Sequence, residues 1–330
     1  MTSREAILHG TREATRLHQE LHTQEDLSKT RGPVDVFGAL LKSEAAVIFR
    51  PLESLLGACL AKPIPGVIIS TQRPLPVQRF TGAHELGHVV MHHPFSVDGD
   101  EILGATSSLP DTAEIQANAF AAAFLIPRWL LAIHAKAQGW NRESVKDPTV
   151  VYQLSLRIGA SFEATIYALK THDLIDGQAF ARLRDIRPKV VKQSLLPGYE
   201  PDNWYRDVWL LTERDEGIVI EGQPDDIFLF RLNEKSGAGY LWDIDELKKQ
   251  GFAVVHDSRN LEELGDRVGG QVLREVTAHP AENSVGEVML SLRRPWQRAA
   301  VPAGELHLHY DIRGKETGLP RALRRQLEAA

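Results

Sequence analysis

Residues with metal-ligand and acid–base chemistry stand together in the segment His84-Glu85-Leu86-Gly87-His88. On an α-helix, positions i and i+4 lie one above the other, so His84 and His88 can offer two imidazole nitrogens to one ion. Glu85 follows the first histidine and can act as the general base that takes a proton from the attacking water. This H-E-x-x-H spacing predicts a zinc-dependent peptide hydrolase.

The helix that must carry these residues is apolar. Its other positions include Ala83, Leu86, Val89, Val90 and Met91. Three ionisable groups would be costly to bury among such side chains without a partner, which favours a metal centre. The alternative is a surface helix whose histidines are satisfied by ordinary hydrogen bonds. The motif alone is only suggestive, because it occurs by chance in about 1% of chains of this length.

A catalytic zinc site also needs a third protein ligand and an open position. Glu114 is the candidate, because it lies 26 positions after His88 in an Ala-rich helical segment from Asp111 to Leu125. The alanines allow this helix to approach the first one closely. The alternative is that Asp111 and Glu114 form a capping arrangement at the start of the second helix.

The other histidines of this region receive smaller roles. His92 continues the stripe of His84 and His88, but it lies about 6 Å further along the helix axis. We therefore expect it to support the ligands or the structure rather than bind the ion. His93 and His134 are expected to be ordinary surface or core residues.

The two predicted helices also carry a longer pattern. Arg79-Phe80-Thr81-Gly82-Ala83 precedes the first motif, and the second segment contains Glu114, Ala117, Asn118, Phe120, Ala121, Ala122, Leu125 and Pro127. This pattern resembles the ImmA/IrrE family of bacterial metallopeptidases. The resemblance implies that His84, His88 and Glu114 bind the metal, that Glu85 is the catalytic base, and that Asn118 supports the ligands. Zinc is the expected cofactor, and manganese or iron also suits this ligand set.

Members of that family are regulatory proteases that cut a helix-turn-helix repressor. The resemblance therefore implies a gluzincin-like metallo-endopeptidase whose substrate is a co-encoded helix-turn-helix repressor. Such cleavage would regulate transcription, for example in a stress response. The identity of the adjacent genes would name the substrate.

A helix-turn-helix signature follows the predicted peptidase at 149–176. Short helices are predicted from Val150 to Ile158 and from Phe162 to Lys170, with Gly159 in the turn. Residues 141–200 carry nine Lys or Arg against seven Asp or Glu, which is a small basic excess. We favour helices that pack against the peptidase, with direct DNA binding as the alternative.

After Pro197-Gly198 the sequence changes to short strand-like runs separated by turn residues, which predict a β-sandwich. Three motifs there resemble the loops of chagasin-like inhibitors of papain-type cysteine proteases, which are immunoglobulin-like domains. They are Gly239-Tyr240-Leu241-Trp242, Gly269-Gly270 and Arg294-Pro295-Trp296.

The resemblance implies a partner-recognition surface made of Tyr240, Trp242, Gly269, Gly270, Arg294, Pro295 and Trp296. Two departures weigh against protease inhibition: the charged stretch 233–238 replaces the family's Pro-Thr-Thr, and Arg267 stands where the second loop has a glycine. The alternative is that Tyr240, Trp242 and Trp296 are core aromatics of the sandwich.

Length, charge and cysteine content restrict the class of protein. The 330 residues exceed one domain. The net charge of −6 argues against a protein that coats nucleic acid. Cys59 is the sole cysteine, so no intrachain disulfide can form. No apolar run of about 18 residues lacks a charge, so we expect a cytoplasmic protein without a membrane span.

These observations predict an α+β multidomain protein. We divide it into a zincin-like metallopeptidase domain (1–137), a helix-turn-helix linking domain (138–198), a chagasin-like immunoglobulin-type sandwich (199–313) and a tail (314–330) expected to be a loosely held helix. In the first domain we expect helices at 3–23 and Val34–Leu41 and strands at Ala45–Phe49 and Gly66–Ser70.

The leading hypothesis is a regulatory metallo-endopeptidase that acts on a partner protein. One alternative is a protein-binding or protease-inhibitor module in which the peptidase fold serves as a scaffold. The other alternative is a DNA-binding regulator.

Overall fold

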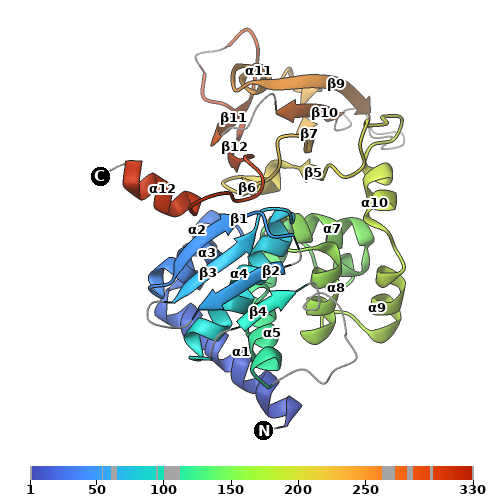
Figure 1. The fold of residues 1–330 in the computed structure, drawn as a ribbon. Helices are drawn as coiled ribbons and strands as arrows, with labels where there is room; N and C mark the ends of the chain where they lie inside the picture. The colour runs from blue at the N-terminus through green and yellow to red at the C-terminus, as the bar shows by residue number, and fades with distance from the viewer. Residues whose placement is uncertain are drawn as a thin grey trace.

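A computed structural model describes residues 2–53, 55–60, 65–93, 96–99, 112–261, 272–280, 285–297 and 300–328. The N-terminal part combines helices with one four-stranded sheet, a group of helices follows, and two further four-stranded sheets form the C-terminal part (Figure 1). This mixture of helices and separate sheets confirms the predicted α+β class.

Three helices precede the first sheet: α1 (Ser3–Glu20), α2 (Thr23–Thr30) and α3 (Val36–Lys42); α1 packs against the later helix α5 (Thr112–Leu125), and α3 contacts the first strand of the sheet. Its strands are β1 (Ala46–Arg50), β2 (Leu55–Leu60), β3 (Gly66–Ser70) and β4 (Ser96–Gly99), in the order β1-β3-β2-β4. β1 and β3 are parallel, whereas β2 is antiparallel to both β3 and β4. The expected strands correspond to β1 and β3, and β2 is an additional strand.

Helix α4 (Leu75–Val90), which carries the H-E-x-x-H segment, packs against α5 (Thr112–Leu125). A Cβ atom on Gly87 would lie 3.2 Å from the Ala117 Cα and 3.2 Å from the Phe120 Cβ. The helices therefore meet so closely that any larger residue at this position would push the neighbouring atoms back by a few tenths of an ångström. Ala117 and Phe120 are fully buried in the contact.

Helix α6 (Arg128–Gln138) starts directly after Pro127. By length and composition the stretch Thr112–Gln138 could cross a membrane, and 56% of its most apolar part is buried inside the protein. The stretch consists of two helices, α5 and α6, interrupted at Ile126-Pro127. Buried core helices pass the same test, so this stretch is weak evidence for a membrane span.

Four helices make up the central part: α7 (Pro148–Arg157), α8 (Phe162–Thr171), α9 (Gly177–Arg184) and α10 (Pro188–Leu195). α7 and α8 lie where the helix-turn-helix signature places them. The Tyr152 hydroxyl of α7 donates to the half-buried Asp207 at 2.8 Å, and the almost fully buried Arg157 and Asp215 form an ion pair at 2.8 Å. These contacts tie α7 to the C-terminal part, and the expected packing against the peptidase and the DNA-binding alternative both stay predictions.

The C-terminal part contains two sheets that share one hydrophobic core. The first has the order β5 (Val208–Leu211), β7 (Ile227–Glu234), β10 (Val272–Pro280), β9 (Phe252–Leu261); the second has the order β6 (Val219–Glu221), β12 (Gly304–Asp311), β11 (Val285–Arg293), β8 (Leu241–Asp243). Side chains of both sheets, such as Phe228, Val276, Leu290 and Leu308, form the core. Four short helices complete the described elements. η2 (Ser144–Lys146) precedes α7, whereas η3 (Glu213–Asp215), η4 (Ser236–Ala238) and α11 (Asp245–Lys249) belong to the C-terminal part.

Most neighbouring strands here are antiparallel, but β5 runs parallel to β7 and β6 parallel to β12. The immunoglobulin-like assignment and the four domain boundaries stay predictions.

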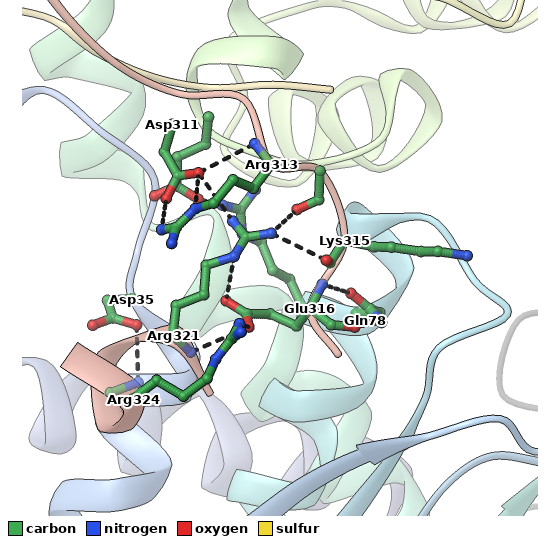
Figure 2. Close-up of polar contacts among 12 residues, drawn as sticks. Asp35, Gln78, Asp311, Arg313, Lys315, Glu316, Arg321 and Arg324 are labelled. Atoms are coloured by element: carbon green, nitrogen blue, oxygen red, sulfur yellow. Dashed lines mark hydrogen bonds and ion pairs between the residues drawn. The ribbon is translucent and has the colours of Figure 1, made fainter. Parts of the chain in front are cut away.

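The C-terminal segment returns to the N-terminal part, and α12 (Arg321–Glu328) lies beside it (Figure 1). The Phe49 N–H donates to the Gly318 carbonyl at 2.7 Å, and the Gly318 N–H donates back at 3.1 Å. The Gln78 side chain of α4 exchanges two hydrogen bonds with the Glu316 backbone, at 3.0 and 2.8 Å (Figure 2). The expectation of a loosely held tail is wrong, because the segment is fastened to the start of α4 and to the edge of β1.

A buried ion-pair network holds this segment in place (Figure 2). Arg321 pairs with Glu316 at 3.3 Å and with Asp311 at 3.4 Å, and the Arg321 and Glu316 side chains are each 7% exposed. Arg321 also donates to the backbone carbonyl of Lys315 at 3.0 Å. Such a network stabilises the contact only while all its members are present, because a lone buried charge is costly.

We predict that Arg321→Met lowers the free energy of unfolding by about 3 kcal/mol, because Glu316 then remains buried without its main partner. Arg324→Met is the matched control, since Arg324 reaches Glu316 at 3.7 Å with a 42% exposed side chain. Its loss should cost less than about 1 kcal/mol. Chemical denaturation measures both, and equal effects would contradict the assignment of a buried network.

Candidate metal centre

The three predicted ligands converge in the structure. The Nε2 atoms of His84 and His88 lie 3.0 Å apart. A Glu114 carboxylate oxygen lies 3.2 Å from the His84 Nε2, and the other lies 3.5 Å from the His88 Nε2. The two imidazoles are buried, whereas the Glu114 side chain is 31% exposed and leads to the solvent. His84, His88 and Glu114 together form a group that could hold a metal ion.

The spacing of these donor atoms fits a zinc ion. Zinc binds imidazole nitrogen and carboxylate oxygen at about 2.1 Å in tetrahedral geometry, which separates neighbouring donor atoms by about 3.4 Å. The three observed separations lie within a few tenths of an ångström of that value. Two imidazoles with one carboxylate leave one position for water, as a catalytic site requires.

The hydrogen bonds behind the imidazoles orient both rings toward the ion site. The His84 Nδ1 lies 3.0 Å from the Asn118 amide oxygen, so this nitrogen donates its proton. The His88 Nδ1 lies 3.0 Å from the His93 Nδ1, and the His93 Nε2 lies 2.9 Å from the Gln116 amide oxygen. This series of hydrogen bonds assigns the proton of His88 to Nδ1 as well. Both Nε2 atoms therefore present a lone pair, which is the form that binds metal.

Asn118 thus lies where a residue that supports a ligand should lie. His92 does not: it is exposed and has a φ of 55° in the turn that ends α4. The expectation that His92 supports the ligands is wrong, and His93 contacts His88 instead. The left-handed residue turns the chain back, so that the His93 N–H donates to the His88 carbonyl at 2.9 Å.

Glu85 is fully buried beside strand β2. A Cβ atom on Gly57 of β2 would lie 3.1 Å from a Glu85 carboxylate oxygen and 2.5 Å from the Thr81 Cγ2. Glycine at position 57 therefore leaves the room that the Glu85 carboxylate occupies. The sequence provides no periodic signal for this contact, because it depends on the pairing of β2 with the other strands.

Glu114 is the charged member of the group. Contact with the His84 imidazole is the main cause that lowers the pKa of the Glu114 carboxyl, and burial opposes this shift. The carboxylate form that binds a cation is therefore favoured. The capping alternative involves Asp111, which lies outside the described residues.

The start of α4 is anchored by a residue to which sequence reasoning gave no role. Arg79 is 5% exposed, forms an ion pair with Glu221 of β6, and donates to the Gly159 carbonyl at 3.3 Å. Helix α4 is therefore connected at its first turns to the central helices and to a C-terminal sheet.

The predicted recognition residues of the β part separate into two groups. Trp242 is 3% exposed, belongs to the core of the two sheets and donates to the Asn233 carbonyl at 2.9 Å. Its assignment to the recognition surface is wrong, and the core alternative holds for it. Gly269 and Gly270 lie outside the described residues.

The other group lies at the surface. The Trp296 side chain is 69% exposed, and its ring covers Gly239, where a Cβ atom would lie 2.4 Å from the ring. The Arg294 guanidinium lies 4.6 Å from the centre of the Tyr240 ring. Pro295 is exposed between Arg294 and Trp296. The turns 238–240 and 294–296 therefore form one surface cluster, in which Pro295 and Trp296 are exposed and Tyr240 and Arg294 are half-buried.

Residues 45–170 match the peptidase M78 family, described as an IrrE N-terminal-like domain. This match supports a regulatory peptidase-type function and a metal cofactor at the level of the family. No curated protein matches the sequence significantly.

Two solved structures are similar to part of the chain. A cysteine protease inhibitor from Entamoeba histolytica is 22% identical, with 34% of this chain and 100% of that chain covered and a TM-score of 0.30. Amebosin is 18% identical, with 32% and 97% covered and a TM-score of 0.25.

We predict that His93→Asn lowers the affinity for zinc by about 10- to 100-fold, because asparagine is too short to connect His88 with Gln116. His92→Asn is the matched control, since asparagine tolerates the left-handed conformation of this exposed position. Competition with a chromophoric chelator measures both affinities. A larger loss in the His92 variant would contradict the assignment of His93.

Proposed function

We propose that this protein is a metal-dependent endopeptidase that cleaves a partner protein. The supporting observation is the convergence of His84, His88 and Glu114 on one point, together with the buried Glu85 that follows His84 on the same helix. The match of residues 45–170 to a peptidase family supports the same reaction class.

The residues of the chain have distinct roles in the proposed reaction. A zinc ion, when bound, supplies the Lewis acidity that polarises a peptide carbonyl and lowers the pKa of water. His84 and His88 hold it as neutral ligands, and Glu114 adds a negative charge. Glu85 accepts a proton from the attacking water and delivers it to the leaving amine. Manganese is the alternative metal for this donor set.

The proposed substrate is a helix-turn-helix repressor encoded next to this protein, and its cleavage in the cytoplasm would relieve repression. This part of the proposal follows from the resemblance of the two motif helices to regulatory metallopeptidases. The contacts of α7 with Asp207 and Asp215 support a packing role for the helix-turn-helix segment. Direct DNA binding is the less favoured alternative.

We predict that the zinc- or manganese-loaded protein cuts the adjacent gene's helix-turn-helix product. Glu85→Gln should lower kcat by at least about 100-fold, because the amide cannot accept the proton. The metal content should stay unchanged, since Glu85 is not a ligand. Glu25→Gln, at an exposed position of α2, is the control and should cut normally.

Electrophoresis and mass spectrometry measure the products. An intact repressor with either metal would contradict the proposed substrate. Cleavage by the Glu85→Gln variant at the wild-type rate would contradict the proposed mechanism.

We propose as a second role that the β part recognises proteins, which is supported by the surface cluster of the half-buried Tyr240 and Arg294 with the exposed Pro295 and Trp296. Aromatic and arginine side chains of this kind are frequent at the centre of protein interfaces. A protease-inhibitor module on a peptidase scaffold would use the same surface.

We predict that Trp296→Ala raises KM for the repressor by about tenfold or more and leaves kcat unchanged, because the contact lies away from the reacting bond. Val301→Ala, also at an exposed position of the β part, is the control. An unchanged KM would contradict substrate recognition by this cluster. Wild-type inhibition of a papain-type protease, lost in Trp296→Ala, would instead favour the inhibitor module.

A further inference from the structure

The second C-terminal sheet carries two histidines on its outer face. Strand β12 contains the alternating run Leu306-His307-Leu308-His309-Tyr310. The two leucines and Tyr310 are buried in the core, with exposed fractions of at most 4%. Because successive side chains of a strand point to opposite faces, both imidazoles lie on the solvent side.

A carboxylate from the neighbouring strand lies between these imidazoles. Glu287 of β11 is paired with His309 in the antiparallel register. One Glu287 oxygen lies 3.0 Å from the His307 Nε2, and the other lies 3.1 Å from the His309 Nδ1. The ring centres of the two histidines are 4.5 Å apart. All three ligand atoms lie within 4.8 Å of one another.

The sheet holds this group in position. The His307 N–H donates to the Glu216 carboxylate at 2.6 Å, and the His307 carbonyl accepts from the Gly217 N–H at 2.7 Å. Strand β12 is therefore fixed by β11 on one side and by the segment before β6 on the other. Donor atoms on a rigid sheet need little further ordering to bind an ion.

Stability alone gives a poor account of the arrangement. An exposed histidine–carboxylate pair contributes at most about 1 kcal/mol. In the described part of the chain, these two histidines are the ion-pair partners found for Glu287. Two imidazoles and one carboxylate are a donor set that transition metals prefer.

We propose that Glu287, His307 and His309 form a second metal site, for a divalent transition metal of the zinc class. The distance from each imidazole nitrogen to a Glu287 oxygen lies within a few tenths of an ångström of tetrahedral spacing. The side chains of Glu287, His307 and His309 are 62%, 29% and 40% exposed, so water completes the coordination. The bound ion joins β11 to β12. This site lies on a different sheet from the candidate metal centre and is independent of the proposed peptidase activity.

Zinc titration of the full chain, stripped of metal and in competition with a chromophoric chelator, tests the proposal. We expect His307→Gln/His309→Gln to bind one equivalent of zinc fewer than the wild type. Glu287→Gln should weaken binding of that equivalent at least about tenfold. The difference does not depend on whether the candidate metal centre is loaded, because each variant keeps His84, His88 and Glu114.

His256→Gln is the matched control, because His256 is exposed on β9 of the other C-terminal sheet. It should bind as much zinc as the wild type. Circular dichroism confirms that the variants remain folded. Equal stoichiometry and affinity in the wild type and in His307→Gln/His309→Gln would overturn the proposal. Loss of the same equivalent in His256→Gln would also overturn it, because the binding would then be unspecific.

Discussion

The close contact between α4 and α5 determines whether the three ligands can meet. His84 and His88 come from one helix and Glu114 from the other, so their distances depend on how near the helices lie. Gly87 against Ala117 and Phe120 permits that approach. The same contact places Asn118 of α5 beside His84. It also places Gln116 of α5 beside His93, which in turn contacts His88. Helix packing thus sets both the ligand geometry and the proton positions on the rings.

Local sequence patterns predicted the elements that carry this centre. Helical periodicity and the four-residue spacing located α4 and its ligands, and the Ala-rich segment located α5 and Glu114. His92 was misassigned because the helical stripe was continued past the end of α4. A left-handed residue there changes the direction of the chain, and periodicity contains no information about such a turn.

Features that depend on pairing between distant segments were harder to predict. Strand β2 is a continuous apolar run without alternation, so its type was ambiguous. Its position nevertheless decides the space around Glu85, through Gly57. Trp242 and Trp296 each end one of the motifs that resemble inhibitor loops, yet Trp242 is buried and Trp296 is exposed. Only the three-dimensional arrangement of the strands distinguishes them.

The docking of the C-terminal segment has a consequence for the order of folding. Gln78 and Glu316, which exchange two hydrogen bonds, are 238 residues apart in the chain. Ribosomes add about 5–20 residues per second, so α4 emerges many seconds before its partner exists. During synthesis the start of α4 therefore lacks these contacts, and the helix that carries His84, Glu85 and His88 becomes fully fastened only after Glu316 has been made.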